Sequence, residues 1–177
     1  VIMCALLIVS CRKKEKEEAP DWASAQDQSI GDVLWQDIYK MVDEEAQING
    51  VSSVRSCGSV TLNPISGFPT TLTIDFGVAG CMGADGRYRK GKVEAVFTGE
   101  WRDSLTIVTV NPINYSVDGY KVEGSKSIEN KGQVNGNLTY DVAVTNGKIT
   151  LPDNSFFTWN SNVQYEWIDG ENTTFLS

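Results

Sequence analysis

The chain has 177 residues, of which 41% are hydrophobic and 21% charged, close to the usual values for globular proteins. Its formal net charge of −8 argues against nucleic-acid binding, because phosphate recognition needs clustered Lys and Arg. The sequence has no His, which excludes Ser-His and Cys-His catalysis and any zinc site that includes His. We expect a globular protein with no metal and no cofactor.

Residues 1–10 form an uncharged apolar run, shorter than the roughly 20 residues that span a bilayer. Such a run is typical of a signal-peptide core, although it begins with Val and lacks a positively charged start, so we expect its N-terminus to be incomplete. The stretch Ile8-Val9-Ser10-Cys11 resembles a bacterial lipobox, which implies cleavage before Cys11 and lipidation of that residue. The alternative is a chance cysteine at the end of a buried strand.

Residues 11–28 follow as a linker that begins with a dense charge run from Arg12 to Glu18. A segment of this composition cannot bury a core and favours a solvated tether after a lipidated cysteine. Several acyl chains would hold the protein firmly to a membrane. Lys16-Glu17-Glu18 also resembles the acidic export signals of Bacteroidota lipoproteins. We therefore expect an outer-membrane lipoprotein, on the periplasmic face or the cell surface.

Residues 29–177 form the predicted globular domain. It opens with apolar residues spaced three and four apart between Ser29 and Asn49, which predict an amphipathic helix packed against the rest of the domain. Asn49-Gly50 is a typical helix end. The apolar positions are Ile30, Val33, Leu34, Ile38, Met41, Val42 and Ala46.

After Val51 the hydrophobic period changes to two, which indicates strands. Asp118-Gly119 predicts a tight hairpin turn, and Asn146-Gly147 and Pro152-Asp153-Asn154 predict two further turns. The predicted strands are 70–76, 92–98, 105–110, 114–117, 120–128, 137–145, 148–151, 155–159 and 162–167.

No segment between these strands is long enough for a crossover helix, so the sequence predicts an all-β antiparallel meander with one N-terminal helix. We expect the meander to form a sandwich or a partly open, curved sheet. The last residues, 173–177, are typical of the start of another strand, so the domain is expected to be truncated at its C-terminus.

Four cysteines are present. If Cys4 leaves with the signal and Cys11 carries lipid, Cys57 and Cys81 remain as a pair in an oxidising compartment, and we expect a disulfide between them. The alternative is two free buried thiols. The spacing is unlike that of redox-active Cys-x-x-Cys pairs.

Four short motifs follow one another around Cys81: Thr73-Ile74-Asp75-Phe76-Gly77, Gly80-Cys81, Asp85-Gly86-Arg87 and Arg89-Lys90-Gly91-Lys92. In this order they resemble a family of Bacteroidota lipoproteins to which no activity is assigned. The resemblance implies an envelope location and this kind of fold, but no chemistry.

Two groups of residues are candidate ligand sites. Arg87, Arg89, Lys90 and Lys92 form a basic turn that could hold an anionic sugar or lipid headgroup, or could be a charged hairpin end. Trp101, Trp159 and Trp167, with nearby Tyr residues, could form a sugar-binding platform or simply belong to the core.

The leading functional hypothesis is a non-catalytic envelope lipoprotein that binds glycans or outer-membrane proteins, or that has a structural role. A glycan hydrolase that uses two carboxylates is the first alternative. An adhesin-like scaffold that pairs through a sheet edge is the second. The carboxylates available for hydrolysis are Glu94, Glu100, Asp103, Glu123 and Asp141.

Overall fold

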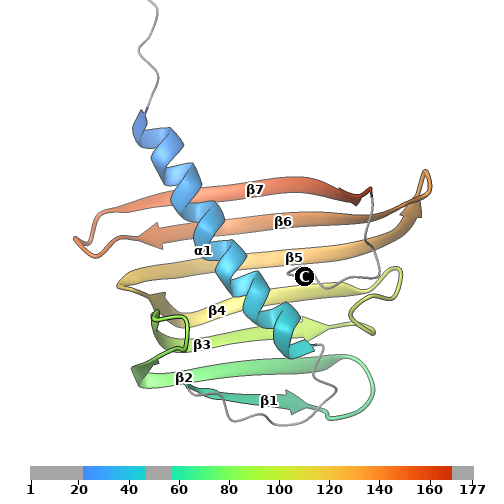
Figure 1. Ribbon diagram of the computed structural model, residues 1–177, viewed down its shortest axis with the longest axis horizontal. Helices are drawn as coiled ribbons and strands as arrows, with labels where there is room; N and C mark the ends of the chain where they lie inside the picture. The colour runs from blue at the N-terminus through green and yellow to red at the C-terminus, as the bar shows by residue number, and fades with distance from the viewer. Residues whose placement is uncertain (1–21, 47–56, 169–177) are drawn as a thin grey trace, which may run out of the picture.

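The computed structural model describes residues 22–46 and 57–168, which form one helix and seven strands. All strands belong to one antiparallel sheet in the order β1-β2-β3-β4-β5-β6-β7, so each strand pairs with its neighbours in the chain (Figure 1). The all-β meander with one N-terminal helix is therefore confirmed. The elements are α1 (Trp22–Ala46), β1 (Ser59–Asn63), β2 (Thr70–Met82), β3 (Tyr88–Phe97), β4 (Ile107–Val117), β5 (Tyr120–Val134), β6 (Asn137–Thr150) and β7 (Phe156–Trp167).

Helix α1 lies diagonally across one face of the sheet, from the β7 edge to strands β2 and β3 (Figure 1). Its buried hydrophobic side chains are Leu34, Trp35, Ile38, Met41 and Val42. The helix begins at Trp22, seven residues before the predicted start, so residues 22–28 are helical rather than part of the linker. Within the part of the chain that is described, no helix is both long and apolar enough to cross a membrane.

Two details of the predicted helix differ from the structure. Val33 was assigned to the buried stripe, but it is 60% exposed, whereas Trp35 is buried instead. With 3.6 residues per turn, Val33 lies about 140° around the helix from the buried Ile38, whereas Trp35 lies only about 60° from it. The predicted end at Asn49-Gly50 lies outside the described residues.

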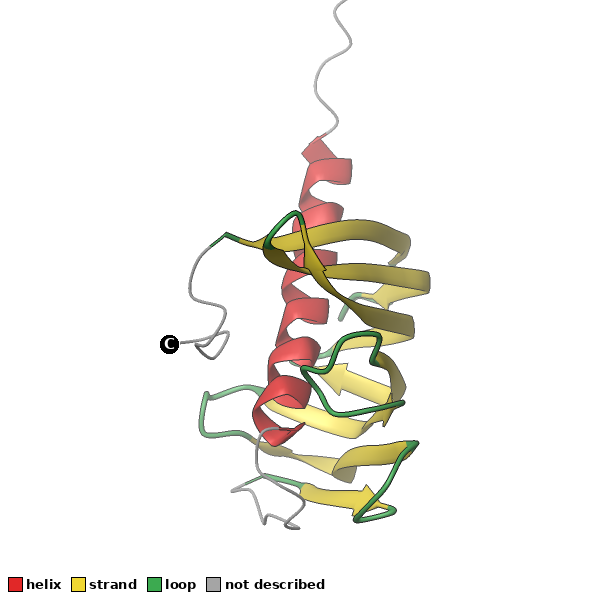
Figure 2. Cartoon of the chain, turned by 90° about the vertical axis from the view of Figure 1, so that its right-hand side faces the viewer, coloured by secondary structure: helices red, strands yellow, loops and turns green. Residues whose placement is uncertain are grey.

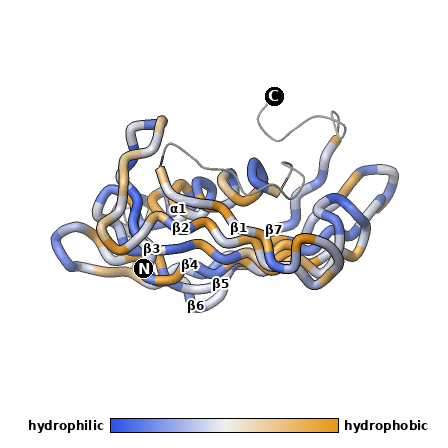
Figure 3. The backbone as a smooth tube through the Cα atoms, turned by 90° about the horizontal axis from the view of Figure 1, so that it is seen from below, coloured by the Kyte–Doolittle hydropathy of each residue, from blue (hydrophilic) through white to orange (hydrophobic). Residues whose placement is uncertain are grey.

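The sheet is open, and α1 takes the place that a second sheet would occupy in a sandwich (Figure 2). Most inward residues of the strands are apolar and buried, as the predicted alternation of Leu72, Ile74 and Phe76 in β2 illustrates. Hydrophobic and hydrophilic residues alternate along the strands (Figure 3). Apolar burial against a single helix is therefore what holds the two layers together.

The Asp118-Gly119 turn is confirmed: it joins β4 to β5, and both residues have positive φ, at 51° and 85°. Such a pair matches a two-residue type I′ hairpin. The predicted turn at residues 152–154 also joins β6 to β7.

The predicted turn at Asn146-Gly147 is wrong, because both residues lie inside the continuous strand β6. Asn146 has a φ of 53°, but here that conformation produces a bulge rather than a reversal. The segments on either side pair with the same two neighbours, β5 and β7. Two further pairs of predicted strands are each one continuous strand: 155–159 and 162–167 are merged in β7, and 105–110 and 114–117 are merged in β4. Leu105 precedes β4 and is 71% exposed.

This bulge belongs to a row that crosses the sheet from β2 to β7. Strands β2, β4 and β6 carry extra residues relative to their neighbours near Phe76, Asn114 and Asn146. On the intervening strands, Gly91 and Gly124 face these bulges, and a Cβ on either glycine would collide with the backbone opposite. The row therefore depends on glycine for close approach of the strands.

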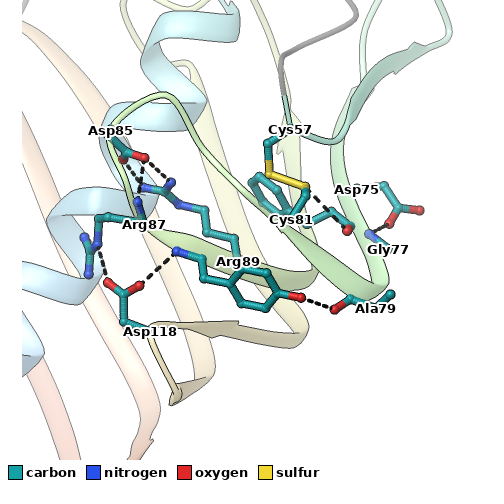
Figure 4. The surroundings of a disulfide bond; sticks show 11 residues. Cys57, Asp75, Gly77, Ala79, Cys81, Asp85, Arg87, Arg89 and Asp118 are labelled. Atoms are coloured by element: carbon teal, nitrogen blue, oxygen red, sulfur yellow. Dashed lines mark hydrogen bonds and ion pairs between the residues drawn. A yellow bond between two sulfur atoms is a disulfide. The ribbon is translucent and has the colours of Figure 1, made fainter.

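Cys57 and Cys81 form a disulfide, as expected, with an S–S distance of 2.13 Å. The bond links the residues before β1 to the far end of β2 (Figure 4). Cys57 is buried.

Candidate functional site

The two arginines of the basic turn lie beneath α1 and bind carboxylates (Figure 4). Arg89 donates to Asp85 through both terminal nitrogens, at 2.9 and 2.6 Å, and to Asp37 on α1 at 2.8 Å. Arg87 binds the same Asp37 at 2.9 Å and Asp118 at 3.1 Å. Three carboxylates thus neutralise two guanidinium groups.

The electrostatics of this cluster favour the ion-paired state. The hydrogen bond from Arg89 holds the pKa of Asp85 well below its usual range. Burial opposes the charge of Arg89, yet the carboxylates of Asp85 and Asp37 raise its pKa overall. Burial and the charge of Asp37 raise the pKa of Tyr115, whose hydroxyl lies 3.4 Å from the Asp37 carboxylate. The cluster fastens the helix to β3 and β4 and leaves no excess positive charge for an anionic ligand.

The two lysines of the basic turn lie on the opposite face of the sheet from Arg89. Lys90 contacts the ring of Tyr88, 5.7 Å from its centroid, and Lys92 pairs with Asp75 at 2.9 Å. The four basic residues are therefore divided between two faces, and they do not form one anion site. This placement supports the structural interpretation of the turn.

The three candidate tryptophans also lie apart. Trp159 is 6% exposed and packs beneath α1, where its Nε1 donates to Gln28 at 2.9 Å. Trp101 stacks at an angle on Tyr39 and Phe97 and lines a cleft of about 390 Å³ near the end of the helix. Trp167 lies at the end of β7. The three do not form a common platform.

Trp167 does, however, belong to a small aromatic pocket between α1 and the last three strands. The cavity measures about 70 Å³, and three tyrosines and one tryptophan contribute to its walls. Val163, Tyr165 and Trp167 alternate along β7 on the side that faces the helix, and Tyr165 pairs across the sheet with Tyr140. The residues that line this aromatic pocket are Gln36, Tyr39, Lys126, Ile128, Tyr140, Val142, Tyr165 and Trp167.

Lys126 is the one basic residue among those that line the aromatic pocket. The residue is only 7% exposed, and its amino group lies 4.9 Å from the centroid of the Tyr39 ring. Among the described residues it makes no ion pair with a carboxylate. An amine in such a position faces the cost of leaving water without a counter-charge to offset it.

Burial therefore lowers the pKa of Lys126 to about 8, and the charge of Asp32 on α1 opposes this shift only weakly. Burial also raises the pKa of Tyr39 and of Tyr140, so both phenols stay neutral over the physiological range. At pH 7 the pocket thus presents one ammonium group among neutral aromatic rings.

The carboxylates considered for hydrolysis do not converge on this pocket, since none of the described residues that line it is acidic. Glu123 pairs with Lys121 at 2.8 Å, and Asp141 accepts from Gln164 at 2.7 Å, both on the opposite face of the sheet. Glu100 lies in the cleft beside Trp101. In residues 22–46 and 57–168, no cluster of three or more His, Cys, Asp or Glu is arranged to hold a metal ion.

Sequence reasoning missed Lys126, although a signal was present. Lys126 and Ile128 share the inward face of β5, so a charged residue occupies a position that the alternation assigns to the core. The alternation along β5 is unbroken, since Val122, Lys126 and Ile128 are all buried, so the strand pattern in the sequence already marked position 126 as inward.

Searches against family models, curated proteins and solved structures returned no match to this chain.

Proposed function

We propose that this protein is a non-catalytic, lipid-anchored binding module of the outer membrane, and that its ligand site is the aromatic pocket. The lipobox-like sequence before Cys11 and the charged run after it support the anchor. The observation that carries the ligand site is Lys126, a buried ammonium that faces aromatic rings without a carboxylate partner among the described residues.

Aromatic rings with a few polar groups are typical of small-ligand sites, and sugars in particular stack on such rings. Tyr165 is 52% exposed at the pocket, so part of its ring is available to a ligand. The acidic surface, with a net charge of −8, disfavours anionic polymers in general. A local ammonium group would then confer selectivity for particular glycans.

The test of ligand binding is a screen of the full chain against an array of neutral and acidic glycans. We expect binding that is lost in Tyr165→Ala and in Trp167→Ala. Phe156→Ala is the matched control, because Phe156 lies on the same strand and is 61% exposed but does not line the pocket. No binding to any glycan, or binding that all three variants retain, would reject the site.

The anchor is tested separately by metabolic labelling with an alkyne fatty acid in a Gram-negative host. The label is expected on the wild-type chain and on Cys4→Ser, but not on Cys11→Ser. Equal labelling of both variants would contradict lipidation at Cys11.

A further inference from the structure

We propose that the ligand carries a carboxylate on a pyranose ring, as in a uronic or sialic acid, and that this carboxylate binds the amino group of Lys126. This inference rests on the proposed function, because it names the class of glycan that the aromatic pocket takes.

Lys126 is a buried residue of β5, and its amino group ends against the Tyr39 ring of α1 at the pocket wall. The contact with the Tyr39 ring stabilises the ammonium group less than water or a carboxylate would. A ligand that brings one negative charge to this position would supply the missing partner.

The hydrogen-bond donors of the pocket favour one kind of anion over another. Phosphate sites usually combine an Arg or several backbone N–H groups at a helix N-terminus. The described lining residues include no Arg, and the pocket lies beside the middle of α1, at Gln36 and Tyr39. One ammonium and one side-chain amide match a singly charged carboxylate better than a phosphate dianion.

The size of the cavity limits how much of the ligand can enter it. A cavity of about 70 Å³ exceeds the space that a single water needs, but it is too small for a whole sugar. The carboxylate would enter the cavity, while the ring to which it is attached would lie against Tyr165 and Trp167 at the open side. A pyranose offers an apolar C–H face for such contact.

The experiment uses two ligands that differ only in the acidic group, methyl β-D-glucuronide and methyl β-D-glucoside, titrated into the full chain by calorimetry or NMR. We expect the glucuronide to bind at least tenfold more tightly. In Lys126→Met this preference should disappear, because methionine keeps the apolar stem and removes the charge. Lys131→Met is the matched control: Lys131 lies on the same strand, but it faces the other side and pairs with Glu129 at 2.9 Å.

Equal affinity of the wild-type chain for the two ligands would overturn the inference, even if Lys126→Met failed to fold. In that case, glycan binding that is lost in Tyr165→Ala and Trp167→Ala would still support the proposed function. Unchanged preference in a folded Lys126→Met variant would overturn it as well. Glucose 6-phosphate is the third ligand. If it binds more tightly than the glucuronide, the inference of a carboxylate ligand is overturned and the site is one for a phosphate. Absence of binding to all three ligands and to every glycan on the array would reject both proposals together.

Discussion

Gly31 of α1 lies directly against the indole of Trp159 on β7. A Cβ at position 31 would come within 2.9 Å of three atoms of the indole ring. Three residues earlier, Gln28 accepts the hydrogen bond from Trp159 Nε1. The helix is thus fixed on the β7 edge by one close approach and one hydrogen bond.

Gly31→Ala should therefore destabilise the domain, although alanine favours a helix over glycine by about 1 kcal/mol. The collision is with the base of a buried ring, so the helix or the indole must move, and we expect a net loss of about 1–2 kcal/mol. Urea unfolding followed by tryptophan fluorescence measures the change. Ser29→Ala, at an exposed helical position, is the control and should be neutral or slightly stabilising. A gain in stability from Gly31→Ala would show that the helix is not held this closely.

Arg89→Met should cost about 3 kcal/mol of unfolding free energy, because it leaves Asp37 and Asp85 without their shared buried partner. The matched change on the exposed face is Lys92→Met, which breaks the ion pair with Asp75. An exposed pair of this kind contributes less than about 1 kcal/mol. Chemical denaturation of both variants gives the comparison, and equal losses would refute a structural role specific to Arg89.

Loss of the disulfide should lower the unfolding free energy by about 3.5 kcal/mol, the chain-entropy value for a loop that joins residues separated by 24 positions. Cys57→Ser/Cys81→Ser and the reduced wild-type chain should give similar urea midpoints. If the double variant unfolded at the same midpoint as the oxidised wild type, the bond would contribute nothing to stability.

Stability should rise with pH above neutrality because of Lys126. The pKa of Lys126 is about 8 in the folded chain, against an ordinary value of 10.5. Between these two pH values the unfolded chain binds more protons than the folded chain, so raising the pH makes unfolding less favourable. We expect a gain of about 2 kcal/mol from pH 7 to 9.5, relative to Lys126→Met.

The titratable groups around this amine are Asp32 and Tyr39 on α1, Tyr140 on β6 and Tyr165 on β7. They are present in both proteins of the comparison, so the difference between wild type and Lys126→Met isolates the lysine. Urea unfolding at several pH values measures it. Parallel pH profiles would show that the amine is solvated in the folded chain.

Much of the fold could be predicted because local patterns agree with the tertiary structure. Alternation placed Leu72 and Ile74 in the core, and Asp118-Gly119 marked a hairpin, since the required positive φ angles occur readily at these residue types. Short connections left no room for parallel pairing.

The remaining features depend on neighbours that are distant in sequence. Asn146-Gly147 has the same local preference in a turn and in a bulge, and only pairing with β5 and β7 distinguishes the two. The sequence left open whether Arg87 and Arg89 form a ligand site or a charged hairpin end, because their partner Asp37 lies about fifty positions away on α1. The aromatic pocket unites four elements, and no spacing within any one of them indicates it.

The row of bulges fixes the register in which the strands of the meander pair. A slip of β4 by one residue would move Asn114 away from Gly91 and bring it opposite a residue that has a Cβ. The same slip would turn the inward valines toward water. Shifted pairings are therefore penalised twice, by collision and by exposure, so Gly91 and Gly124 select the correct assembly of the sheet without adding to its core.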